Sequence, residues 1–128
     1  AAQVVKLMLK KRIHVAGAHI LILGLTFKEN CPDLRNTAVI NIIRELDTYG
    51  AEVEVFDPWV DRNEAESLYK VRMVEYPAQG RYDAVVAAVA HREVITLDPA
   101  ALRSFCREQA VIYDVKHALQ EGLADASL

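Results

Sequence analysis

Uninterrupted apolar runs, each about the length of one strand, constrain the fold of this chain most. Residues 19–23 (HILIL) are apolar at every position after the histidine, and residues 84–90 (AVVAAVA) are apolar throughout. A half-exposed strand would alternate apolar and polar residues, so such runs indicate strands buried on both faces of a parallel sheet. Because parallel strands are joined by crossovers that are usually helical, the sequence predicts an α/β fold with helices on both faces.

Helical and extended patterns alternate along the rest of the chain. Further strands are expected at residues 52–56, 71–74 and 110–113, and helices at 4–11, 37–49, 61–69 and within 96–106, with a last turn or helix at 117–122. Asp98 and Pro99 stand where a helix cap and first turn are expected. The pattern predicts a Rossmann-like three-layer sandwich around a mostly parallel five-stranded sheet.

Composition excludes several classes of protein. The chain has 128 residues, 52% of them hydrophobic and 26% charged, with a net charge of -3. No basic run exceeds residues 10–12, so nucleic acid is not an expected partner. No apolar segment approaches the roughly 18 residues of a membrane span. Cys31 and Cys106 form neither a disulfide framework nor a metal-binding spacing, which favours a reducing, cytoplasmic location.

The segment after the first predicted strand carries the candidate ligand-binding residues. Gly24 follows the strand, and Lys28 and Arg35 come soon after it. Ligands of open α/β sheets bind at the carboxyl ends of the strands, so these two cations are placed to meet an anionic ligand. Asn36 or Thr37 can cap the following helix, whose first amides would add partial positive charge.

This segment lacks the usual glycine fingerprint of a dinucleotide-binding loop. That pattern, G-x-G-x-x-G, requires further glycines where this chain has Thr26 and Glu29. A phosphate or base is therefore expected to be held by side chains more than by the backbone.

Residues 24–35 (GLTFKENCPDLR) contain the restrictive pattern G-x-x-F-K-x-x-x-x-D-x-R. Together with residues 56–59 (FDPW), 82–85 (YDAV) and 113–116 (YDVK), they resemble the C-terminal, UDP-binding domain of the UDP-glucose/GDP-mannose dehydrogenases. Within that family the chain is most similar to the Vi-polysaccharide-type branch, which oxidises UDP-N-acetylglucosamine or UDP-N-acetylgalactosamine. The resemblance covers nearly the whole chain.

The resemblance implies a part of a larger enzyme. Such enzymes have an N-terminal NAD-binding domain, a central helix that mediates homodimerisation, and this C-terminal domain. They oxidise the C6 hydroxyl of a UDP-sugar to a carboxylate in two NAD-dependent steps, through a thioester on a cysteine in a glycine-rich motif that this chain lacks. Residues 1–14 would then be the end of the central helix and a connector, with a fraying N-terminal helix as the alternative, and residues 15–128 the UDP-binding domain. Alone, the chain is not expected to be catalytic.

The resemblance also assigns residue roles. Phe27 and Lys28 match the pair that contacts the nucleotide end of the substrate, although Phe27 could equally be a core residue. Lys116 stands where glucose-specific relatives have a substrate-contacting arginine, so a surface lysine is its alternative. Arg35 matches the arginine that reaches NAD, and an ion pair with Asp33 or Glu29 could coexist with that role.

Three other residues could have a direct functional role, but we favour other interpretations of them. Cys31 lies near Lys28, but the catalytic cysteine of the family is elsewhere. His91 follows the fourth predicted strand and is expected to be structural rather than a pocket residue. Asp57 ends the second predicted strand, where it is expected to cap the turn before Trp59 rather than to bind a ribose.

Two other functions remain as alternatives. An autonomous NAD-binding domain would bind NAD and not UDP, and the missing glycines argue against it. A non-enzymatic signalling module of the response-regulator kind would need an acidic cluster at the strand ends, where this chain instead has Lys28 and Arg35.

Overall fold

The computed structural model describes residues 1–35 and 37–127. Its strands are β1 (His19–Leu23), β2 (Glu52–Phe56), β3 (Arg72–Met73), β4 (Tyr82–Ala87), β5 (Cys106–Asp114) and β6 (Ala126–Ser127). Within the described residues they form one sheet in the order β3-β2-β1-β4-β5-β6, and every neighbouring pair is parallel. The predicted fold class is confirmed. The predicted count of five strands is wrong, because β6 is too short to show a sequence period.

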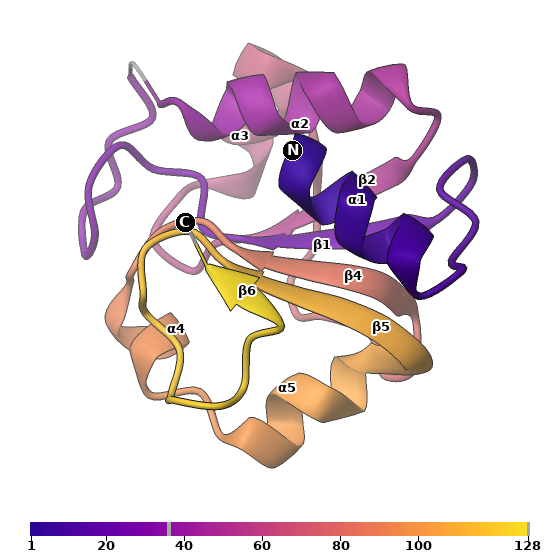
Figure 1. Ribbon diagram of the computed structural model, residues 1–128. Coiled ribbons are helices and arrows are strands. Elements are labelled where there is room, and N and C mark those ends of the chain that lie inside the picture. The colour runs from indigo at the N-terminus through magenta and orange to yellow at the C-terminus, as the bar shows by residue number, and fades with distance from the viewer. Residues whose placement is uncertain (36, 128) are drawn as a thin grey trace.

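Helices cover both faces of the sheet, as Figure 1 shows. One face carries α1 (Ala2–Lys10), α2 (Val39–Thr48) and α3 (Arg62–Tyr69), and the other carries α4 (Arg92–Ile95) and α5 (Pro99–Phe105). None of the helices among the described residues is long and apolar enough to cross a membrane.

Strand β1 joins the two halves of the core. Ile20 and Ile22 point to the face covered by α1, α2 and α3, whereas Leu21 and Leu23 point to the face covered by α4 and α5. Neighbouring side chains of a strand point in opposite directions, so an uninterrupted apolar run is required when both faces are covered. None of these four side chains is more than 1% exposed, which confirms the predicted double burial.

Aspartate side chains cap α3 and α5, and the cap at Asp98 was predicted. Asp61 accepts a hydrogen bond from the Glu64 amide at 3.0 Å, and Asp98 accepts one from the Ala100 amide at 3.1 Å. The N-cap position of α2 is Ala38, which makes no side-chain cap bond. Thr37, the residue before it, accepts the amide hydrogen of Val39 through Oγ1 at 3.2 Å. The alternative cap, Asn36, lies outside the described residues. Helix α4 was not predicted, because a single turn carries no amphipathic period.

The free edge of β5 is covered by side chains. Strand β5 begins earlier than predicted and bulges between the pairs Tyr82–Cys106 and Ala84–Val111. Beyond the reach of β6, Lys11 Nζ donates to the Ala110 carbonyl at 2.7 Å. Asp125 accepts from the Ile112 amide at 2.7 Å through Oδ2, and its own amide donates to the Ile112 carbonyl at 2.7 Å. These contacts satisfy backbone groups that have no neighbouring strand.

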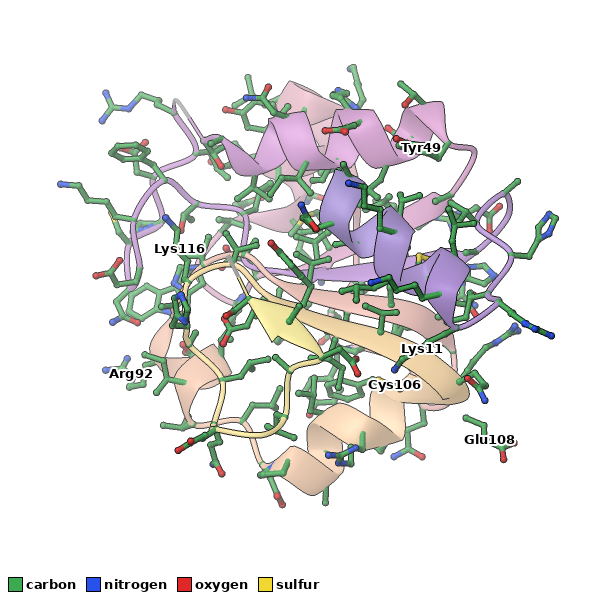
Figure 2. All side chains as sticks on the ribbon, in the orientation of Figure 1. Lys11, Tyr49, Arg92, Cys106, Glu108 and Lys116 are labelled. Carbon is green, nitrogen blue, oxygen red and sulfur yellow. The ribbon has the colours of Figure 1, made fainter. Side chains whose placement is uncertain are left out.

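Because the strands are parallel, the loops that follow β1, β2, β4 and β5 all leave from one edge of the sheet, called here the carboxyl edge. In Figure 2, Lys116 and Arg92 lie at this edge, whereas Lys11, Cys106 and Glu108 lie at the opposite edge. The fold therefore brings the predicted ligand-binding segments to the same side of the molecule.

Candidate functional site

The loop after β1 begins at a position that only glycine can occupy without strain. Gly24 has a φ of +99°, and a Cβ added to it would lie 2.6 Å from Val89 Cβ. The chain after β4 is this close because the amides of Ala88 and Val89 both donate to the Leu23 carbonyl, at 2.9 and 3.2 Å. The missing side chain at Gly24 therefore lets the loops after β1 and β4 lie against each other.

Asp57, at the end of β2, anchors the first residues of the loop. Its Oδ2 accepts hydrogen bonds from the Leu25 amide at 2.7 Å and the Thr26 amide at 3.3 Å. Its Oδ1 accepts from the Trp59 amide at 2.8 Å, which confirms the predicted turn cap. The side chain is 0% exposed, so this carboxylate is not available to a ribose.

His91 connects this carboxylate to the other end of the loop. Its Nε2 lies 2.9 Å from Asp57 Oδ2, and its Nδ1 accepts a hydrogen bond from the Asn30 amide at 2.9 Å. Because the Asn30 N–H is a donor, Nδ1 carries no proton and the Nε2–H donates to Asp57. The ring is 0% exposed and stacks on Trp59 at a centroid distance of 6.0 Å. This agrees with the expected structural role of His91.

The Asp57–His91 pair was not predicted as a unit, although the sequence holds a signal for it. Asp57 directly follows β2, and His91 follows β4 within a short distance. Those two strands flank β1. Polar residues that follow the two neighbours of a central parallel strand meet over the carboxyl end of that strand, which here is the start of the loop.

Phe27 and Lys28 project from the apex of this anchored loop. Thr26 Oγ1 donates to the Lys28 carbonyl at 2.7 Å, and the Phe27 amide donates to the Asp33 carbonyl at 3.2 Å. Phe27 is 55% exposed, so it is not a core residue. Lys28 is also exposed, and within residues 1–35 and 37–127 its Nζ makes no hydrogen bond or ion pair. The loop thus presents an aromatic ring and an unpaired cation at the carboxyl edge.

Arg35 makes the ion pair with Asp33 that was expected as a coexisting contact. Its Nε lies 3.0 Å from Asp33 Oδ1, its Nη2 donates to Asp33 Oδ2 at 3.2 Å, and its amide donates to Oδ1 at 2.9 Å. The hydrogen bonds from the side chain and backbone of Arg35 hold the pKa of Asp33 below its usual value. The Arg35 side chain is nevertheless 84% exposed, and its Nη1 faces away from these bonds. The guanidinium is therefore oriented and still open to a ligand.

Lys116 lies in the turn after β5. The Asp114 carboxylate accepts from the amides of Ala118 and Leu119, both at 2.9 Å, and the Val115 amide donates to the Ala87 carbonyl at 2.9 Å. These bonds hold the turn, while the Lys116 side chain is exposed at the carboxyl edge (Figure 2). Strand β4 lies between the strands that lead to Lys28 and Lys116, so the two lysines belong to one edge but not to adjacent loops.

Cavities lie at both edges of the sheet. A cavity of about 470 Å³ at the opposite edge is lined by residues that include Lys11, Arg103 and Cys106. Burial raises the pKa of the Cys106 thiol, which makes it a poor nucleophile. A cavity of about 350 Å³ beside the turn after β5 includes Asp114 and His117. Neither cavity includes Phe27 or Lys28, whose side chains are both exposed. The described residues hold no group of side chains arranged to bind a metal ion.

Comparisons with known proteins identify the family of this chain. A sequence model of the UDP binding domain of the UDP-glucose/GDP-mannose dehydrogenase family matches residues 21–121. The chain is 48% identical to the UDP-N-acetyl-D-glucosamine 6-dehydrogenase of Pseudomonas aeruginosa and covers 30% of that protein with 99% of its own length. It is 41% identical to the enzyme of the same name from Salmonella typhi, with 98% of this chain and 30% of that protein covered.

Solved structures agree with the sequence comparisons. A UDP-glucose dehydrogenase from Pyrobaculum islandicum superposes with a TM-score of 0.73 at 26% identity, over 98% of this chain and 28% of that one. The chain therefore spans about a third of the length of its relatives, and it belongs to the UDP-glucose/GDP-mannose dehydrogenase family as a UDP binding domain.

Proposed function

We propose that this chain is the UDP-recognising C-terminal domain of an NAD-dependent nucleotide-sugar 6-dehydrogenase. The enzyme would oxidise the C6 hydroxyl of a UDP-N-acetylhexosamine to the uronic acid, for synthesis of a surface polysaccharide. The observation that carries this proposal is the match of nearly the whole chain to two UDP-N-acetyl-D-glucosamine 6-dehydrogenases, at 48% and 41% identity. The chain contributes no catalytic residue in this scheme; its role is to bind and orient the substrate.

Phe27, Lys28 and Lys116 are the proposed substrate-binding residues. The diphosphate of a UDP-sugar is an anion, and an ammonium group is a compact partner for its oxygens. Lys28 supports this role because it is exposed and its Nζ makes no salt bridge or hydrogen bond among the described residues, while its backbone is held in the loop by Thr26. The exposed ring of Phe27 offers a flat apolar face to a base.

Arg35 is the proposed contact to NAD, which accepts hydride when it is bound in such an enzyme. The free side of its guanidinium suits a phosphate or carboxamide oxygen. The loop after β1 offers no glycine-lined cradle for a pyrophosphate, since Thr26 and Glu29 stand where glycines would be needed. We therefore place the main NAD site in an N-terminal domain outside this chain.

Residues 1–14 are proposed to be the end of the central helix and its connector, and the complete enzyme a homodimer. Val4, Val5 and Met8 pack α1 onto the sheet, so a helix that continued in the N-terminal direction would leave the domain at a defined angle. Cys31 and Cys106 are both free thiols, which supports a reducing compartment such as the cytoplasm.

An amide NMR titration with UDP and, separately, with NAD tests the proposed function. UDP should shift the amides of Phe27, Lys28 and Lys116 with a dissociation constant near the millimolar range, equivalent to about -4 kcal/mol. Lys28→Ala should weaken binding by at least about tenfold, since a hydrogen bond to a charged group contributes roughly 1.5–3 kcal/mol. Lys10→Ala is the matched control, because Lys10 is an exposed lysine of α1 next to Lys11.

The outcomes separate the alternatives. UDP binding that survives Lys28→Ala would contradict the proposed role of Lys28. Shifts with NAD and none with UDP would favour an autonomous cofactor domain. If neither ligand caused shifts up to about 10 mM, the proposal that this chain alone carries a usable half of the substrate site would be wrong.

A further inference from the structure

We propose that His91 is a positioning residue for the loop that carries Lys28, and that it acts through the backbone of Asn30. The inference rests on the proposed function only where it links this loop to UDP affinity. His91 itself is 0% exposed and sits beneath the loop, so it does not meet a ligand at the carboxyl edge.

The imidazole connects the buried Asp57 carboxylate to the loop that carries Lys28. On one side, Nε2–H donates to Asp57 Oδ2 at 2.9 Å. On the other, Nδ1 accepts the Asn30 amide hydrogen at 2.9 Å. The Thr26 hydroxyl lies 3.2 Å from Nε2 and accepts a second, weaker contact, since its own hydrogen is used by the Lys28 carbonyl. Nε2 is therefore the donor of the ring, chiefly to Asp57, and Nδ1 is the acceptor for Asn30.

Asn30 is the residue of the loop that needs this support. Its φ of +54° lies in the left-handed region, which asparagine tolerates better than most residues but which is still unfavourable without tertiary contacts. Its side-chain oxygen accepts from the Arg92 amide at 2.7 Å, so the backbone and side chain of Asn30 are both held by the segment after β4. Loss of the His91 acceptor would leave one of these two attachments.

Hydrogen bonds to the backbone amides of Thr26 and Asn30 flank Lys28 in the sequence. Two residues before it, the Thr26 amide is bound by Asp57, and two residues after it, the Asn30 amide is bound by His91. The Lys28 backbone is thus held from both sides, while its side chain remains free. A loop that is already ordered loses less conformational entropy when a ligand binds, so the His91–Asn30 bond should raise affinity without any contact to the ligand.

Two substitutions of His91 distinguish its hydrogen bond to Asn30 from its hydrogen bond to Asp57. His91→Gln places an amide near the position of Nε2 and can still donate to Asp57, but it leaves the Asn30 amide without an acceptor. His91→Asn places an oxygen near the position of Nδ1 and can keep the Asn30 bond while it loses the bond to Asp57. Both variants put a smaller polar side chain in the same buried place, so each is the control for the other.

Three quantities should be measured on the 128-residue chain and on both variants. They are amide hydrogen exchange at Asn30, the UDP dissociation constant from NMR titration, and the melting temperature. In His91→Gln we expect Asn30 exchange and the UDP dissociation constant each to rise roughly tenfold, the factor expected when about one backbone residue is freed. In His91→Asn both should stay within about threefold of the parent chain, although the lost bond to Asp57 should lower the melting temperature of this variant too.

Several results would overturn the inference. Unchanged Asn30 exchange in His91→Gln would do so, as would equal losses of affinity in both variants that simply follow their melting temperatures. Ring nitrogen shifts of the parent chain that place the proton on Nδ1 would also do so, even if neither variant folds. If the parent chain does not bind UDP, the proposed function fails, and Asn30 exchange still decides whether His91 positions the loop.

Discussion

Asp57 is expected to be the most important buried polar side chain for the stability of the carboxyl edge. Its carboxylate accepts hydrogen bonds from four donors, which are the amides of Leu25, Thr26 and Trp59 and the Nε2–H of His91. These donors belong to the loops after β1, β2 and β4. Replacing Asp57 by alanine would remove all four bonds. The three amides would lose the acceptor that Asp57 supplies, and His91 Nε2–H would keep only the weaker contact to Thr26 Oγ1 at 3.2 Å.

The magnitude follows from these contacts. A buried donor left without a partner costs about 1–3 kcal/mol. The bond from Thr26 is long, at 3.3 Å, and the loop can relax to admit water, so the four contributions will not add fully. Removal of one partner of a buried, hydrogen-bonded charge typically costs about 3–5 kcal/mol, and we expect Asp57→Ala to fall in this range. Since domains are usually stable by about 5–15 kcal/mol, most of the variant should still fold.

Urea denaturation of the parent chain and the variant measures this difference. The matched control is Asp61→Ala, because Asp61 is also an aspartate that caps a backbone amide, through its single bond to Glu64, but is exposed. Loss of an exposed helix cap should cost about 1 kcal/mol. The reasoning is refuted if Asp57→Ala destabilises the chain no more than Asp61→Ala does.

Two further predictions concern other parts of the fold. Gly24→Ala should destabilise the chain by about 2 kcal/mol or more, because the new Cβ would lie 2.6 Å from Val89 Cβ at a positive φ; a denaturation midpoint equal to that of the parent chain would contradict this. Burial and the hydrogen bond to Glu54 raise the pKa of Tyr82 to about 12 from 10.0, so this stabilisation is complete below about pH 10 and is lost as the pH rises towards 12. Tyr82→Phe should therefore reduce the fall in stability between about pH 9 and pH 11.5, and identical slopes for the two chains would count against the assignment.

The layered fold could be predicted because its signals are local. An uninterrupted apolar run such as residues 19–23 must be buried on both faces, and β1 is. An amphipathic helix such as α2 must bury its apolar stripe, and Val39, Ile43 and Leu46 are buried. The elements that were missed have no comparable signal. Helix α4 has four residues and β6 has two, so neither is long enough to repeat its amphipathic period. These short elements depend on tertiary contacts with other parts of the same chain; β6, for example, forms by pairing with the end of β5.

The sequence predicted the location of the candidate site at the carboxyl edge, but not the hydrogen bonds that hold its loop. The positions of Lys28, Arg35 and Lys116 after predicted strands placed them at the carboxyl edge. The Arg35–Asp33 ion pair was also expected, because the two residues are close in sequence. The pairing of His91 with Asn30 was not, since it depends on a left-handed backbone at Asn30 and on the depth at which the loop lies over β4. Neither is encoded in a local pattern.

The side chains that cover the edge of β5 have a consequence for the behaviour of the chain at high concentration. An open strand edge can recruit a strand from another molecule and start aggregation. Here the outward amide and carbonyl of Ile112 are bound by Asp125, and the Ala110 carbonyl is bound by Lys11, whose ammonium also pairs with Asp125 at 2.9 Å. Intermolecular strand addition at these residues would have to break that ion pair and desolvate both charges. We therefore expect the Lys11–Asp125 pair to disfavour intermolecular strand pairing at this part of β5, which β6 is too short to cover.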